Sequence, residues 1–187
     1  MPDSTKFWER AGIPNADGFS QLLFNDSTGR VVAAMSRIIQ GHPFGILYAR
    51  GRDDDKYSVL ADESDDGISF NFPVLASGGP YLFVLSMKVV EREGQYIGYD
   101  NIGIRKLDLS NAEAVLTMSD SDLVPEPPYD RIWASTIVGH KSEDTLFCSV
   151  GMQRTDDNSR PVDYYLCEVD VANHTVERVS KLHEVFI

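Results

Sequence analysis

Several signatures that would assign a function directly are missing from this chain of 187 residues. Its two cysteines do not form a Cys-x-x-Cys pair, which excludes the zinc-ribbon and thioredoxin-type motifs. No Gly-x-Ser-x-Gly elbow occurs, so the usual signature of a serine hydrolase is absent. No apolar run reaches the ~18 residues that a membrane span needs, and we expect no membrane partner.

Basic charge is also scarce. The chain has 17 Lys and Arg residues against 29 Asp and Glu residues, and its formal net charge is −12. Such a surface repels phosphate backbones, so we expect no nucleic-acid partner. The N-terminal stretch MPDSTKFWERAGIP lacks the apolar segment of a secretory signal, which favours a cytoplasmic protein. Secretion by an unrecognised route, or removal of a signal, is the alternative.

The stretch from Tyr81 to Met118 predicts three antiparallel strands, over residues 82–91, 96–107 and 113–118. Gly94-Gln95 separates the first two strands and predicts a type II′ hairpin turn, because glycine accepts a positive φ. Upstream, apolar and polar side chains alternate with the period of a half-buried strand. Pro73 in that run predicts an edge strand or a bulge.

The same layout recurs later in the chain. Leu82-Phe83 returns as Leu146-Phe147, and Leu107-Asp108-Leu109 returns as Val169-Asp170-Val171 at nearly the same spacing. One more strand precedes each copy, over residues 68–76 and 132–140. Each copy then has its strands in meander order, as in a propeller blade. We therefore predict an all-β fold, an antiparallel meander of repeated four-stranded units.

We expect a single β-domain over residues 1–187, because this length is ordinary for one domain. Along it we predict an irregular lead-in, a degenerate first unit, a second unit, a connector and a third unit, over residues 1–18, 19–61, 68–118, 119–130 and 131–182. In the degenerate unit, Val31 to Ser36 and Ile46 to Ala49 are matched to the first two strands of the repeat. The connector is expected to be stiff and exposed, because it holds three prolines and four acidic residues.

The segments IRKLDLSNAEAVLTM and YLCEVDVANHTVERVSKL are similar to the outer strand pair of kelch-like, TolB-like and related propellers. There, a strand ending in an x-Asp-x turn precedes a short polar loop and a return strand. The resemblance covers about residues 68–182 and implies a fold without an activity. Because propellers have ~4–8 blades, we expect a partial propeller, or one completed by self-association through bare strand edges. A β-sandwich or barrel is the alternative.

Cys148 and Cys167 flank the loop RTDDNSRPV. If that hairpin is symmetric about residues 157–158, the two cysteines lie nearly opposite each other on paired strands. A disulfide is then conceivable, although directly cross-strand pairs are often strained. We favour two buried thiols that pack as small apolar groups.

Residues 30–52 form a window without a single acidic residue in this acidic chain. We predict a site there for an anionic ligand, because guanidinium groups bind carboxylates and phosphates with two hydrogen bonds. The candidate ligand-binding residues are Arg37, Arg50, Arg52 and His42. The alternative is that these side chains pair with acidic residues nearby.

Residues 53–66 are dense in carboxylates, which are the ligands that calcium prefers. The candidate calcium ligands are Asp53, Asp55, Asp65 and Asp66. A second cluster in the connector consists of Asp120, Asp122 and Glu126. Solvated loops are the alternative for both, and we expect no other cofactor.

Two functions follow from these observations. The first is a non-catalytic β-sheet binding or interaction module, able to form homo-oligomers, that presents the arginine-rich patch to an acidic ligand or protein partner. The second is a propeller-type carbohydrate-active enzyme or lectin that uses loop carboxylates. A pair of carboxylates ~5–10 Å apart inside a pocket would favour a glycoside hydrolase.

Overall fold

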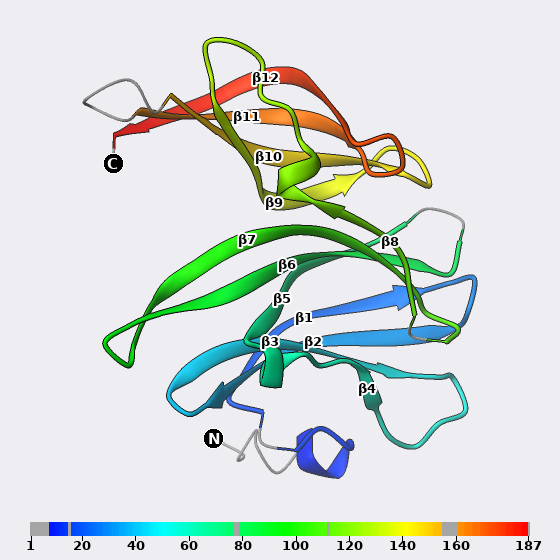
Figure 1. The fold of residues 1–187 in the computed structure, drawn as a ribbon. Helices are drawn as coiled ribbons and strands as arrows, with labels where there is room; N and C mark the ends of the chain where they lie inside the picture. The colour runs from blue at the N-terminus through cyan, green and yellow to red at the C-terminus, as the bar shows by residue number, and fades with distance from the viewer. Residues whose placement is uncertain (1–7, 15, 77–78, 112, 155–160, 187) are drawn as a thin grey trace.

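A computed structural model describes the chain except for residues 1–7, 15, 77–78, 112, 155–160 and 187. The described residues form three four-stranded antiparallel sheets, each in meander order (Figure 1). The predicted all-β fold of repeated four-stranded units is therefore confirmed, and the sheets do not close into a ring. No helix in the described part of the chain has the length and apolarity to cross a membrane.

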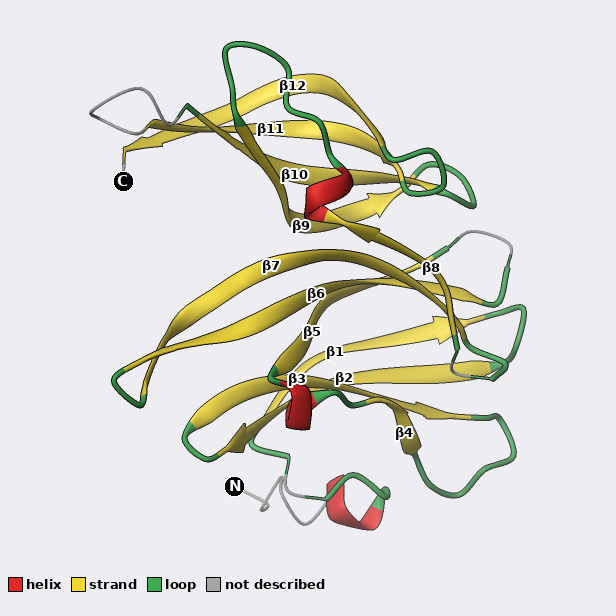
Figure 2. Cartoon of the chain, viewed as in Figure 1, coloured by secondary structure: helices red, strands yellow, loops and turns green. Residues whose placement is uncertain are grey.

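Sheet A contains β1 (Gly18–Asn25), β2 (Arg30–Ile39), β3 (His42–Arg50) and β4 (Ser58–Ala61). Sheet B contains β5 (Ile68–Leu75), β6 (Tyr81–Arg92), β7 (Gln95–Asp108) and β8 (Ala114–Ser119). Sheet C contains β9 (Arg131–His140), β10 (Thr145–Gln153), β11 (Pro161–Asp170) and β12 (Thr175–Phe186). Two short 3-10 helices, η1 (Ser64–Asp66) and η2 (Asp120–Asp122), precede β5 and β9 (Figure 2).

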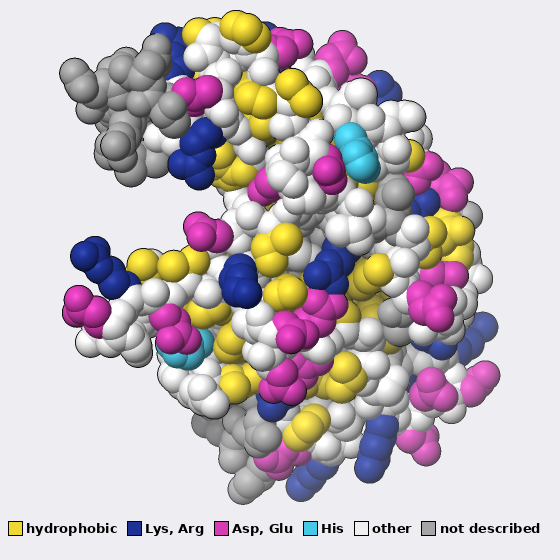
Figure 3. Space-filling view, in the orientation of Figure 1, with side chains coloured by type: hydrophobic (Ala, Val, Ile, Leu, Met, Phe, Trp, Pro, Cys, Tyr) yellow, Lys and Arg dark blue, Asp and Glu magenta, His cyan; other side chains and the backbone are white. Residues whose placement is uncertain are grey.

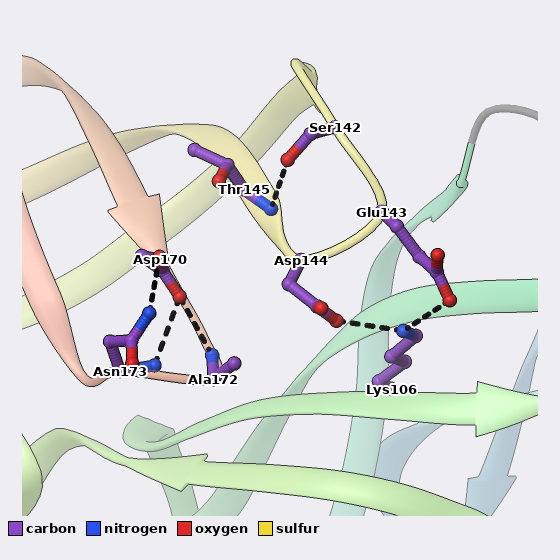
Figure 4. Close-up of polar contacts among 8 residues, drawn as sticks. All are labelled: Lys106, Ser142, Glu143, Asp144, Thr145, Asp170, Ala172 and Asn173. Carbon is purple, nitrogen blue, oxygen red and sulfur yellow. Dashed lines mark hydrogen bonds and ion pairs between the residues drawn. The ribbon is translucent and has the colours of Figure 1, made fainter.

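The internal repeat is visible in the turn that follows the third strand of sheets B and C. In sheet B the Asp108 Oδ1 atom accepts a hydrogen bond from the Ser110 backbone nitrogen at 2.7 Å. In sheet C the Asp170 Oδ1 atom accepts from the Ala172 and Asn173 nitrogens at 3.0 and 2.9 Å (Figure 4). These aspartates hold matching Asx-type turns, and the Asn173 bonds lower the pKa of Asp170.

A backbone hydrogen bond closes the same turn in both sheets. The Leu109 nitrogen donates to the Pro80 oxygen at 2.7 Å, and the Val171 nitrogen donates to the Asp144 oxygen at 2.9 Å. Each bond ties the end of the third strand to the residue just before the second strand. The sequence similarity between the two units therefore reflects one shared local structure.

Two local predictions were wrong. The hairpin between β6 and β7 turns at Glu93-Gly94, both with positive φ (54° and 75°), which is the pattern of a type I′ turn instead of a type II′ turn at Gly94-Gln95. The type I′ turn matches the twist of the flanking strands. In sheet A, residues 31–36 and 46–49 belong to the second and third strands, because β1 supplies the first strand. Pro73 lies at a bulge in the edge strand β5, as predicted.

The three sheets stack face to face, with sheet B in the middle (Figure 1). Alternate residues of β6 pack into the junction with sheet A and into the junction with sheet C. Leu82 and Val84 enter the hydrophobic cluster shared with sheet A, whereas Phe83 and Leu85 enter the cluster shared with sheet C. All four side chains are fully buried, so sheet B is a core layer on both faces.

The outer face of sheet A is covered by the lead-in. Residues 8–10 form a helical turn, and Ile13 and Ala16 are buried against β2 and β3. The Tyr57 nitrogen donates to the Ala11 oxygen at 2.7 Å, which fastens the lead-in to the segment before β4. This end of the stack is therefore capped by the chain itself.

Lys106 joins sheets B and C at one side of their junction. It lies on β7, is only 4% exposed, and places its Nζ atom 2.7 Å from Asp144 and 3.5 Å from Glu143 in the β9–β10 loop (Figure 4). The same nitrogen lies 4.0 Å from the centre of the Tyr81 ring. A buried ammonium group needs such partners, so this contact fixes how the two sheets meet.

Cys148 and Cys167 are directly paired across β10 and β11, as the symmetric hairpin predicted. Both are buried free thiols. Burial raises the pKa of Cys148 to about 12 and that of Cys167 to about 11. They pack as small apolar side chains in the cluster between sheets B and C.

Candidate functional site

A groove of about 1100 Å³ separates the middle of β7 from the start of β9. Figure 3 shows the molecule hollowed between sheet C and the β6–β7 hairpin. Both sheets and the segment between them contribute to its lining. The lining residues are Tyr99, Asp100, Asn101, Asp120, Ser121, Leu123, Pro125, Asp130, Arg131, Ile132, Trp133 and Gln153.

Asp120 is the most perturbed carboxyl group in this groove. It begins η2, where Ser119 forms a capping box with Asp122. Its Oδ1 atom accepts a hydrogen bond from the Ala134 nitrogen of β9 at 3.2 Å. Its Oδ2 atom is buried and has no hydrogen-bond partner among the described residues. Burial raises the pKa of Asp120 to about 6, although the bond from Ala134 opposes the shift.

The groove carries an excess of negative charge at its mouth. Asp100 and Asp130 are exposed, and Arg131 is the cation among the lining residues. Asp130 is held in place because its backbone nitrogen donates to the Gln153 oxygen at 3.0 Å. An anionic ligand would therefore meet a repulsive surface here.

Two aromatic residues line the groove from opposite sides, and the rings of both extend away from it. Tyr99 comes from β7, and its hydroxyl donates to the Pro43 oxygen at 2.8 Å. Burial raises the pKa of Tyr99 to about 12. Trp133 comes from β9, and the Arg131 guanidinium lies 6.0 Å from its ring centre. Both rings are half-buried, so each is fixed in position while part of its surface stays accessible.

The connector borders the groove, and although most of its residues are exposed, two of them are buried. Leu123 is 4% exposed and Tyr129 is 8% exposed, and both join the cluster between sheets B and C. The Tyr129 hydroxyl donates to the Asp163 carboxylate at 2.5 Å and lies 2.8 Å from the Tyr165 hydroxyl. These contacts raise the pKa of Tyr129, after the larger effect of burial. Leu123 and Tyr129 therefore hold the connector against sheets B and C, because burial of their side chains is favourable.

The arginine-rich window does not form one cluster. Arg37 pairs with Phe44 in the register of β2 and β3, whereas Arg50 pairs with Val31. Six residue pairs separate these positions, which corresponds to ~20 Å along the strands. Arg50 and Arg52 lie at one end of sheet A, and His42 lies at the other. The antiparallel hairpin therefore spreads residues that are close in sequence.

Three of these predicted ligand-binding residues have intramolecular partners. Arg37 lies 3.5 Å from Asp62. The Arg50 guanidinium lies 5.3 Å from the centre of the Tyr57 ring. The His42 Nε2 atom is 3.0 Å from Glu91 in the β6–β7 hairpin. Arg52 is exposed.

The predicted calcium ligands lie in two separate surface segments. Asp53 and Asp55 are exposed in the turn between β3 and β4, and Asp65 and Asp66 are exposed on η1. Within the described ranges, no group of three or more His, Cys, Asp and Glu side chains is arranged to hold a metal ion. The calcium hypothesis therefore has no geometrical support in that part of the chain.

Sequence reasoning named part of the groove and missed the rest. It singled out Asp120 in a second acidic cluster, because the connector is acidic. It gave no role to Tyr99, Asn101 or Gln153, which lie in ordinary strand patterns and carry no local signal. It did not single out Trp133 either. An aromatic residue at a strand start after a proline-rich connector is the one signal that could have drawn notice.

Comparison with known proteins gives no relative from which a function could be carried over. No protein-family description matches this sequence, and no curated protein matches it either.

Proposed function

We propose that this protein is a non-catalytic binding module and that the groove between sheets B and C holds a neutral, hydroxyl-rich ligand such as an oligosaccharide. One observation supports this most strongly: carboxylate and amide groups from sheet B and from the segment before sheet C line one cavity. Such groups can bind neighbouring hydroxyls with paired hydrogen bonds.

The charge of the groove supports a neutral ligand over the acidic one that the arginine window suggested. Asp100, Asp120 and Asp130 outnumber Arg131 in the lining. Arg37 and Arg50 are too far apart to grip one small anion. An acidic ligand would need to approach a chain whose net charge is −12.

Fluorescence of Trp133 tests the proposal. The chain has two tryptophans, so a Trp8→Phe background leaves Trp133 as the only reporter. Glucose-, mannose- and N-acetylglucosamine-based oligosaccharides would be titrated into this protein. We expect at least one series to change the emission saturably, and Asp100→Ala with Asn101→Ala to weaken it about tenfold.

The matched control is Asp66→Ala, which removes from η1 one exposed carboxylate that does not belong to the groove lining. It should leave the affinity unchanged. If none of the three sugar series changes the emission at millimolar concentration, the proposed ligand class is wrong.

A glycoside hydrolase is the second candidate, and the raised pKa of Asp120 favours it. A general acid must keep its proton near neutral pH, and a pKa of about 6 suits that role. Asp100 and Asp130 would supply the second carboxylate. Release of nitrophenol from aryl glycosides by the wild type, abolished in Asp120→Asn, would decide for the enzyme. No release alongside saturable binding would decide for the module.

A further inference from the structure

Sheet C differs from sheets A and B in how its two faces are covered. The three hydrophobic clusters of the described residues lie between sheets A and B, between sheets B and C, and under the lead-in on sheet A. None of them lies on the outer face of sheet C. In a stack of sheets, an end face that carries apolar side chains needs a cap or a partner.

The outer face of sheet C carries large apolar and aromatic side chains. Because Ala134, Cys148 and Cys167 point into the cluster with sheet B, the residues that alternate with them point outward. The outward side chains that are half-buried are Trp133, Phe147, Tyr164 and Leu166.

The aromatic side chains on this face pack on one another. Trp133 lies directly on the backbone of Gly151, where an added Cβ would come within 2.5 Å of the indole ring. Tyr164 meets Trp133 edge to face at 6.5 Å, and it stacks on His183 at 4.7 Å. These residues form one continuous aromatic surface that another sheet could cover.

Charge on this face is nearly balanced, unlike charge on the rest of the chain. Lys141 pairs with Glu168, and Arg131 and Glu177 lie in outward positions of β9 and β12, as Asp170 does at the end of β11. The face thus has two cations and three anions, whereas the whole chain has a net charge of −12. A second copy could therefore approach this face without the repulsion that it would meet elsewhere.

The size of the face is adequate for a dimer. Four strands ~4.8 Å apart and about ten residues long cover roughly 600 Å² per copy, so two copies would bury at least ~1,200 Å². That area reaches the lower limit of specific interfaces.

We propose that the outer face of sheet C is the surface on which a second copy of this chain packs, in a twofold, sheet-on-sheet dimer. The same face then serves both copies, as in other isologous interfaces. Head-to-tail closure into a ring would instead need the outer face of sheet A, which the lead-in already covers. Trp133 lines the groove as well, so the second copy would lie beside the mouth of the groove.

The solution mass tests this proposal. One chain has a mass of 20.9 kDa, and light scattering should give twice that value at high protein concentration and a falling value on dilution. Leu166→Lys puts a charge in place of an apolar side chain on this face and should raise the dissociation constant at least ~tenfold. The control is Val59→Lys on β4, which changes an apolar residue that is 56% exposed in sheet A and should leave the dimer intact.

A second variant guards against misfolding. Glu168→Lys changes a polar position on the same face and puts a like charge beside Lys141, so it should weaken the dimer without a core substitution. Far-UV circular dichroism would confirm that each variant is folded. A wild type that stays monomeric at high concentration overturns the proposal. So does a dimer that survives both face variants.

Discussion

Sheet B has a neighbour on each face, and the two junctions are built differently. On the side of sheet A, the end of the β6–β7 hairpin leans onto β3, where Glu91 lies 3.0 Å from His42 and Tyr99 donates to Pro43. On the side of sheet C, the same hairpin borders the groove. Because the end of the hairpin packs against sheet A, it does not fill the space between sheets B and C, and the groove remains there.

The two 3-10 helices show what this difference does to similar residues. Both helices contain serine and aspartate, and each leads into the first strand of a sheet. On η1, Asp65 and Asp66 are exposed to water. On η2, Asp120 is bonded to Ala134 of β9, and burial there raises its pKa. Position beside a junction, more than composition, sets the chemistry of the carboxyl group.

The largest effect on stability is expected from two core substitutions, which test whether the A–B junction and the B–C junction are equally well packed. Leu82→Ala removes a buried side chain from the A–B junction, and Leu85→Ala removes one from the B–C junction. Both residues are 0% exposed, so each change should lower the free energy of unfolding by ~2–5 kcal/mol in urea denaturation. If either substitution lowers the free energy of unfolding by less than ~1 kcal/mol, the junction that it affects is loosely packed and the stack is not one folding unit.

Asp120→Asn should have the next largest effect, and it should stabilise the protein. The folded-state pKa is raised from 3.8 to about 6, so the wild type loses stability as the pH rises through that value. Asparagine keeps an oxygen for the Ala134 nitrogen and carries no charge. We expect a gain of up to ~2–3 kcal/mol at pH 8 that disappears near pH 4.

Asp66→Asn is the matched change on η1 and should leave the unfolding free energy nearly unaltered, because Asp66 is exposed. Thermal melts of both variants from pH 4 to pH 8 make the comparison. Equal, pH-independent changes in stability for the two variants would show that the junction does not raise the pKa of Asp120.

Tyr99→Phe should have the smallest effect. It removes the hydrogen bond to the Pro43 oxygen that holds the hairpin against sheet A, at a cost of about 1 kcal/mol. Amide hydrogen exchange should accelerate at the hairpin end, over residues 89–98, and not in β10. Tyr57→Phe, in the segment before β4, is the control and should leave exchange in the hairpin unchanged. Exchange that is unaltered in Tyr99→Phe as well would mean that other contacts hold the hairpin.

The elements of the fold could be predicted because their signals are local. Alternating side chains marked the strands, and Asp108 and Asp170 marked a turn that has the same hydrogen bonds in both units. The pairing of Cys148 with Cys167 followed from the symmetry of one hairpin. Each of these features depends on residues within one strand, one turn or one hairpin.

The site could not be predicted in the same way, because it depends on how separate units stack. Asn101 and Trp133 line one groove only because Lys106 and the shared core set sheet C against sheet B. The arginine-rich window shows the opposite case. Arg37 and Arg50 are near in sequence, but the antiparallel hairpin places them at different positions on sheet A.

The titration of Asp120, followed by carbon-13 NMR of its side-chain carboxyl, tests the open junction most directly. Our account predicts a midpoint at about 6, since burial beside β9 disfavours the charged form. A midpoint near the ordinary value of ~4 would mean that water reaches this carboxyl freely, and that the junction between sheets B and C does not enclose it as described.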